Sequence, residues 1–106
     1  MRGTRGVVTL VFDDGYRAVF DQVLPLLKRF GIRAVFAVPV DTLRLERDEG
    51  APVVSLQEWK RACADSGHEL AAHGVTHRAL PSLDDAELEA ELRRSQKETA
   101  ATTLVY

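Results

Sequence analysis

Cysteine is almost absent from this sequence: Cys63 is the only one among 106 residues. A single cysteine excludes a disulfide framework within the chain, and its place beside alanines in a predicted helix favours a small buried thiol. The sequence also lacks an apolar run long enough to cross a membrane, and we see no signal peptide ahead of the first predicted strand. These absences leave the cellular location of the protein open.

An excess of positive charge is missing too. The 14 Lys and Arg residues against 16 Asp and Glu residues give a formal net charge of -2. No basic cluster argues for binding to nucleic acid or to an anionic membrane surface. Hydrophobic residues make up 45% of the chain and charged residues 28%, which is ordinary for a globular protein. The length predicts one small domain, residues 1–106, with a limited core.

The sequence does contain an alternation of strand and helix patterns. Strands are predicted at 7–12, 33–38, 68–72 and 102–106. The first of these is an uncharged, β-branched run, which predicts a strand buried on both faces. Because helical patterns stand between the strands, the order favours an α/β fold with parallel strands and right-handed crossovers.

The helical segments carry recognisable starts and stops. Residues 19–30 have helical spacing, and Pro25 either lies in the first turn of the regular helix or kinks it. Ser55 and Glu58 have the form of a capping box ahead of a helix running to residue 64. Asp84 caps a further helix that runs to about residue 99, with Leu88 and Leu92 on one face. Residues 41–52 are charged and predict a loop with at most one helical turn.

Polar chemistry is concentrated at the ends of two predicted strands. Asp13 and Asp14 end the first strand, and His73 and His77 follow the third. The carboxyl ends of parallel strands lie on the same edge of a sheet, so we expect these groups to converge. Two imidazoles four residues apart and one carboxylate supply the three protein ligands of a catalytic zinc site. Gly74 stands where a zinc-protease helix would carry its Glu, so a base must come from elsewhere, and Asp13 or Asp14 is the obvious source.

Other notable residues have simpler interpretations. We interpret His68 as an imidazole at the surface or strand edge, far from the proposed site, and Glu69 as a structural hydrogen-bond acceptor. Trp59 has helical spacing and is assigned to the core. Tyr16 and Arg17 follow the Asp pair and are expected to line a cleft.

The segments LVFDDGY, LPLLKRFGIRAVFAV and SGHELAAHGVTHRAL resemble the polysaccharide deacetylase family, carbohydrate esterase family four, over nearly the whole chain. The resemblance implies the N-terminal half of a distorted (β/α) barrel. It also implies a metal-dependent hydrolase that removes N- or O-acetyl groups from a polysaccharide. Carried over by motif, Asp13 is the general base, and Asp14, His73 and His77 bind a divalent metal, most often zinc.

The resemblance also sets expectations for partners and location. It implies an acetylated carbohydrate polymer or oligomer as the partner, and we take Tyr16, Arg17 and Tyr106 as candidate substrate contacts. Related proteins suggest a bacterial cell envelope or secreted location, with a cytoplasmic one left open.

The sequence departs from the family pattern in two ways. Val11, Val35 and Gly74 stand where the family usually has hydroxyl-bearing residues, so the metal ligands have fewer supporting hydrogen bonds. Tyr106 falls where a further motif begins, so the resemblance implies that the general acid lies outside this chain. We therefore expect a chain that binds zinc, deacetylates poorly or not at all, and self-associates through exposed strand edges.

Three other functions fit parts of the pattern. A phosphatase with an aspartyl nucleophile requires an Asp-x-Asp motif, but Gly15 stands where the second Asp of that motif would be. A non-haem iron oxygenase also uses two His and one carboxylate, but mostly on double-sheet β folds. A non-catalytic metal-binding or saccharide-binding module stays open, and acetate release is the assay that separates it from an enzyme.

Overall fold

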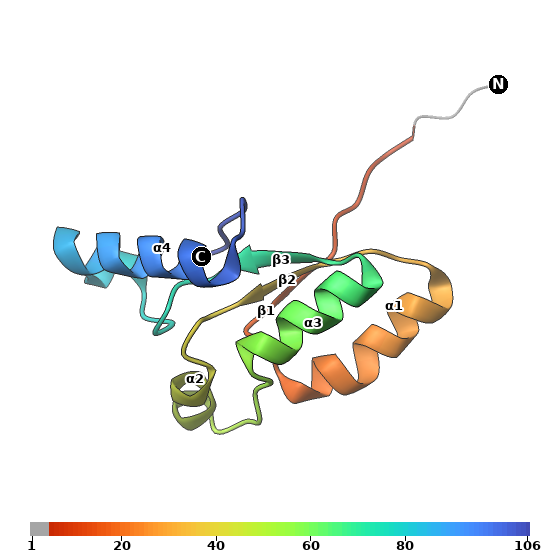
Figure 1. Ribbon diagram of the computed structural model, residues 1–106, viewed down its shortest axis with the longest axis horizontal. Coiled ribbons are helices and arrows are strands. Elements are labelled where there is room, and N and C mark those ends of the chain that lie inside the picture. Colours follow the sequence, from red (N-terminus) through yellow and green to blue (C-terminus); the bar gives the residue numbers. More distant parts are fainter. Residues whose placement is uncertain (1–4) are drawn as a thin grey trace.

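The computed structural model describes residues 5–106 and has a parallel three-stranded sheet in the order β1-β2-β3. The strands are β1 (Val11–Asp13), β2 (Val35–Val38) and β3 (Glu69–Ala72). Figure 1 shows α1 and α3 on one side of this sheet and α4 extending past the arrowhead of β3. This arrangement confirms the predicted α/β fold, with parallel strands joined through helices.

The helices follow the caps in the sequence. A π-helical segment (η1, Val19–Val23) leads directly into α1 (Leu24–Phe30), and Pro25 lies in the first turn of α1, where no N–H is needed. Ser55 Oγ accepts a hydrogen bond from the Glu58 N–H and starts α3 (Leu56–Ser66). A 3₁₀ turn (η2, Leu80–Ser82) precedes α4 (Asp85–Thr99), whose complete capping box begins at Asp84. No helix in residues 5–106 is both long enough and apolar enough to cross a bilayer.

One predicted loop is in fact a helix, α2 (Thr42–Glu49). The Asp41 side chain accepts a hydrogen bond from the Arg44 N–H, and Gly50 ends the helix in the left-handed conformation. Leu45 is buried, whereas Leu43 is exposed. The prediction of a loop was wrong because a single apolar anchor gives too weak a periodicity to stand out in so charged a segment.

The first and last predicted strands are shorter than expected. β1 begins only at Val11, and Val7 and Val8 are 94% and 84% exposed. Val11 is 47% exposed as well, so the prediction of a strand buried on both faces was wrong. Within the described residues β1 pairs only with β2 and forms an edge of the sheet. The last segment forms an isolated parallel bridge between Ala72 and Leu104 rather than a full strand.

The core lies between the sheet and the helices α1 and α3. Its buried members are Leu27, Ala34, Phe36, Val38, Val54, Leu56, Trp59 and Cys63. Trp59 is fully buried, with its ring 4.8 Å from that of Phe36 and 5.0 Å from that of Phe20. The core assignments of Trp59 and Cys63 are confirmed.

His68 also belongs to the interior, so its interpretation as a surface or strand-edge imidazole was wrong. Its Nδ1 accepts a hydrogen bond from the Ala34 N–H at 3.1 Å, and its ring packs edge-on against Phe36 at 5.2 Å. Burial, together with the nearby charge of Arg33, lowers the pKa of His68 from its usual range. The imidazole can be buried because a backbone donor satisfies it in its neutral form. Glu69, by contrast, is confirmed as an acceptor, from Thr103 Oγ1 at 2.7 Å.

Candidate metal centre

The carboxylate side of the site is a turn that directly follows β1. Asp14 and Gly15 both have left-handed backbones, with φ of 77° and 83°. The Gly15 carbonyl accepts hydrogen bonds from Trp59 Nε1 at 3.1 Å and from the Val54 N–H at 2.9 Å. The Asp14 N–H donates to the Ala37 carbonyl at 2.8 Å. The sheet and the core therefore fix the Asp14 carboxylate at the carboxyl edge of the strands.

The imidazole side is the loop that follows β3. It is a turn rather than a helix, with left-handed φ values of 75° at Gly74 and 61° at His77. The Asp41 N–H donates to the Val75 carbonyl at 2.9 Å, which joins this loop to the segment after β2. The four-residue spacing of His73 and His77 is thus used in a compact turn, and both rings face the same side.

The two segments meet at one point. Asp14 Oδ1 lies 2.9 Å from Nε2 of His73 and 2.9 Å from Nε2 of His77. The potential ligand atoms of the three residues all lie within 4.8 Å of one another. The His73 side chain is 8% exposed, that of Asp14 17% and that of His77 30%. The residues are therefore partly buried, with access from the His77 side.

The hydrogen bonding of His73 shows that this cluster fits a cation. Nδ1 lies 2.8 Å from the Val105 carbonyl, and Nε2 lies 2.9 Å from Asp14 Oδ1. A neutral imidazole has one N–H and cannot donate to two acceptors. If Nδ1 of the neutral ring donates to Val105, the lone pair of Nε2 faces a carboxylate oxygen, and a cation between the two atoms would replace this repulsion by attraction to both. Two imidazole nitrogens and one carboxylate are also a donor set used by catalytic zinc, with Nδ1 oriented by a carbonyl.

Asp13 lies next to this cluster in the chain but outside it. It is the last residue of β1, is exposed, and pairs in register with Ala37. The three-residue cluster found among the described residues does not include it. Asp13 is therefore not one of the three candidate ligands.

The three candidate substrate residues lie in different surroundings. Tyr106 lines a cavity of about 370 Å³ beside the two imidazoles, whose other walls are His73, Gly74, His77, Arg78, Ala79, Leu80, Pro81, Leu104 and Val105. Tyr16 is near Asp14, and burial together with the charge of that carboxylate raises the pKa of Tyr16. Arg17 pairs with Asp21 at 3.7 Å on the exposed side of η1. Neither Tyr16 nor Arg17 lines this cavity.

Glu91 is a residue of the site region that the sequence reasoning missed. It is buried on α4, for which the sequence had indicated a face formed by Leu88 and Leu92. The residues of α4 that are buried are Glu91, Ser95 and Thr99, all polar and four residues apart. This polar stripe at helical spacing is the signal that could have revealed Glu91.

Comparison with known proteins identifies the family and the fold. The family described as Polysaccharide deacetylase matches residues 1–105. A search of curated proteins finds no match. Several solved structures share the fold. A family 4 carbohydrate esterase from Streptomyces lividans in complex with acetate is 26% identical, with a TM-score of 0.71 over 95% of this chain and 50% of that chain.

Two further structures are more distant in sequence. The Streptococcus pyogenes deacetylase PplD in complex with acetate is 22% identical, with a TM-score of 0.69 over 94% of this chain and 44% of that chain. The Xyl-CE4 domain of a multidomain xylanase from the hindgut metagenome of Trinervitermes trinervoides is 22% identical, with a TM-score of 0.66 over 91% of this chain and 44% of that chain. The chain thus spans about half the length of the structures it resembles.

Proposed function

Because the chain belongs to the polysaccharide deacetylase family, we propose that it carries the metal-binding half of a hydrolase that removes N- or O-acetyl groups from a carbohydrate polymer. The observation that carries this proposal is the convergence of Asp14, His73 and His77 within 4.8 Å, with the exposed carboxylate of Asp13 next to them in the chain. The linkage cut is a carbon–nitrogen bond outside a peptide, or the corresponding ester.

Zinc is the metal we assign to the site, held by Nε2 of His73, Nε2 of His77 and the carboxylate of Asp14. When bound, zinc polarises the carbonyl of an acetyl group and lowers the pKa of water. The hydrogen bond from His73 Nδ1 to the Val105 carbonyl keeps that imidazole oriented with Nε2 toward Asp14. Asp13 is free to take the proton of the attacking water, because its carboxylate is exposed and lies outside the ligand cluster.

The cavity beside the imidazoles is where we place the sugar. Leu80, Leu104 and Tyr106 give it apolar walls next to the ligands. An aromatic ring and aliphatic side chains would cover the apolar face of a pyranose, and its acetyl group would then lie next to His73 and His77, which also line the cavity. Tyr16 is assigned a secondary contact through its hydroxyl, near Asp14, and Arg17 is kept as a weaker candidate outside this cavity. On the family alone, we propose a location at the bacterial cell envelope or outside the cell.

The experiment that tests this proposal is acetate release from acetylated glucosamine oligomers and from acetylated xylan. It is run on the chain and on the natural gene product that contains it, each loaded with zinc. In the active form, Asp13→Asn is expected to lower turnover by about 10²–10⁴-fold, the contribution of a positioned base, with zinc still bound. A variant that retains full turnover contradicts the role of Asp13, and a zinc-loaded gene product that releases no acetate contradicts the proposed activity.

A second function is favoured by one observation, the 44–50% of its relatives' length that this chain spans. Residues that make up this share of the fold can bind metal and saccharide without completing the reaction. For the chain alone we expect stoichiometric zinc with little or no acetate release. Measurable turnover by the 106-residue chain would contradict this expectation.

A further inference from the structure

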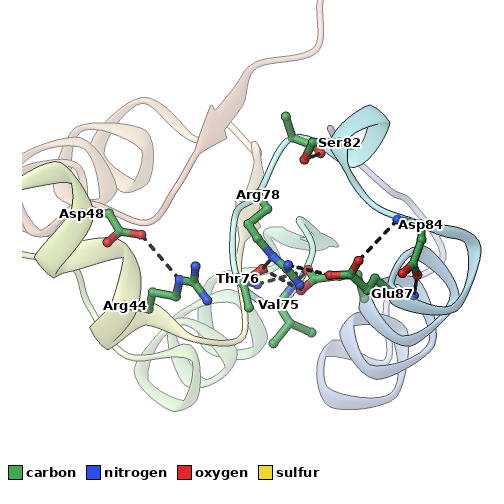
Figure 2. A network of polar contacts seen from close by, with 10 residues as sticks. Arg44, Asp48, Val75, Thr76, Arg78, Ser82, Asp84 and Glu87 are labelled. Carbon is green, nitrogen blue, oxygen red and sulfur yellow. Dashed lines mark hydrogen bonds and ion pairs between the residues drawn. The ribbon is translucent and has the colours of Figure 1, made fainter.

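A carboxylate on α4 reaches into the turn between the two histidines. Glu91 Oε2 accepts hydrogen bonds from the N–H groups of Val75 at 2.7 Å and Thr76 at 3.1 Å, and Oε1 accepts one from Thr76 Oγ1 at 2.6 Å. Figure 2 shows this network converging on the turn, with Arg78 and Glu87 beside it. Three donors from two successive residues are therefore held by one side chain that comes from another element.

The network is built tightly around this carboxylate. Glu91 is 5% exposed, and a Cβ on Gly74 would lie only 3.2 Å from its Oε2. Burial alone would raise the pKa of Glu91, but the hydrogen bonds from Thr76 and Val75, with the charge of Arg78, lower it overall. Charge-assisted hydrogen bonds of this kind are about twice as strong as neutral ones.

The held turn is the segment that carries His77. That residue has a left-handed backbone at φ 61°, which a residue with a Cβ adopts at a cost of about 1 kcal/mol. The same conformation directs its Nε2 to Asp14 Oδ1 at 2.9 Å. A turn under such strain needs fixed hydrogen bonds to persist, and Glu91 supplies them one and two residues before His77.

We propose that Glu91 is a positioning residue for the metal centre: its carboxylate fixes the turn 74–76 and thereby aims His77 at the ion shared with Asp14 and His73. The proposal deepens the proposed function and rests on it for the identity of the ion. Glu91 contacts no ligand itself and acts through the backbone of Val75 and Thr76.

Two variants separate the reach of this side chain from its charge. Glu91→Gln keeps the length and loses the charge: its carbonyl oxygen accepts both backbone N–H groups, and its amide donates to Thr76 Oγ1. Glu91→Asp keeps the charge but is shorter by about 1.5 Å, one carbon–carbon bond, and cannot reach the turn. If Glu91 acts by position, Glu91→Gln binds the ion well and Glu91→Asp does not.

The primary measurement is zinc affinity by competition with a chromophoric chelator, with the visible spectrum of the cobalt-loaded protein as the signature of ligand geometry. We expect Glu91→Asp to bind zinc about 10–100-fold more weakly, with an altered cobalt spectrum, and Glu91→Gln to stay within about threefold of the wild type. Glu87→Gln is the matched control, because Glu87 meets the network at its exposed end through Arg78 at 2.8 Å. The Gln side-chain oxygen can still accept from the Asp84 N–H, so the capping box of α4 is kept. Leu27→Ala controls for a loss of stability in the core away from the site.

Amide hydrogen exchange without metal makes the test independent of the ion. We expect the Val75 and Thr76 amides to be protected in the wild type and in Glu91→Gln, and to exchange faster in Glu91→Asp. If the wild type binds no zinc, the proposed metal centre fails, while the exchange data still decide the role of Glu91. The proposal is overturned if Glu91→Asp equals or exceeds Glu91→Gln in zinc affinity or in protection of the Val75 and Thr76 amides.

Discussion

Replacing Gly15 by alanine tests how the core holds the carboxylate turn. The new Cβ would lie 2.7 Å from Trp59 Nε1 and 3.2 Å from Val38 Cγ1, and the backbone would keep its left-handed φ of 83°. The conformational cost is about 1 kcal/mol. Forcing the indole away adds about 1–3 kcal/mol of overpacking, which includes weakening its hydrogen bond to the Gly15 carbonyl. We expect Gly15→Ala to lose about 3 kcal/mol of unfolding free energy.

Gly31 offers the matched control. It has a similar φ of 65° at the end of α1, but a Cβ there would meet nothing within 4 Å. Gly31→Ala is therefore expected to cost only the backbone term, about 1 kcal/mol. Both variants are compared by urea unfolding monitored by circular dichroism. The slopes of unfolding free energy against urea concentration should be equal for the comparison to hold. If Gly15→Ala is no more destabilising than Gly31→Ala, the contact between Trp59 and the turn does not have the role given to it here.

Three further predictions concern the edge strand, a buried imidazole and the lone thiol. In the described residues, the edge of β1 that faces away from β2 has unpaired backbone groups, so we expect the chain to self-associate as its concentration rises. A clean monomer by light scattering at high concentration would contradict this expectation. The pKa of His68 is lowered in the folded state by burial and by Arg33, so the unfolded chain takes up a proton below about pH 6.5 and stability falls as the pH drops further. Urea midpoints at pH 7.5 and 5 should therefore differ more for the wild type than for His68→Gln, and equal differences would refute the argument. Burial raises the pKa of Cys63 to about 11, so its reaction with a thiol reagent at pH 8 should be slow until urea unfolds the chain, and fast labelling of the folded protein would contradict its burial.

The sequence predicted the parts of the fold that depend on local signals. The helical spacing over residues 19–30 matches the end of α1 at Phe30, and the Asp84 cap placed the start of α4 correctly. The expected end of that helix near residue 99 also agrees with the structure. The grouping of Asp14 with His73 was also predictable, because both follow parallel strands and so lie at one sheet edge. The candidate site was therefore predicted mainly from the polar residues that directly follow apolar runs.

The features that were missed depend on contacts between distant segments. Whether β1 is buried depends on which other segments pack against it, and an apolar run in the sequence does not contain that information. His68 is buried because the Ala34 N–H, 34 residues away, satisfies it. Glu91 looked like one more charge on an exposed helix, because its three donors lie 15 and 16 residues away. A buried polar group is predictable only when its partner is known.

The central claim is that Asp14, His73 and His77 hold one divalent ion, and equilibrium dialysis against zinc with metal analysis tests it directly. We predict one zinc per chain, with a loss of affinity of more than about 100-fold in His77→Asn, since Asn tolerates the left-handed backbone but is too short to reach the ion. His68→Gln, which changes an imidazole that accepts from the Ala34 N–H instead of facing Asp14, should keep its zinc. A wild-type chain without zinc, or a His77→Asn chain that binds it as tightly, would contradict the claim.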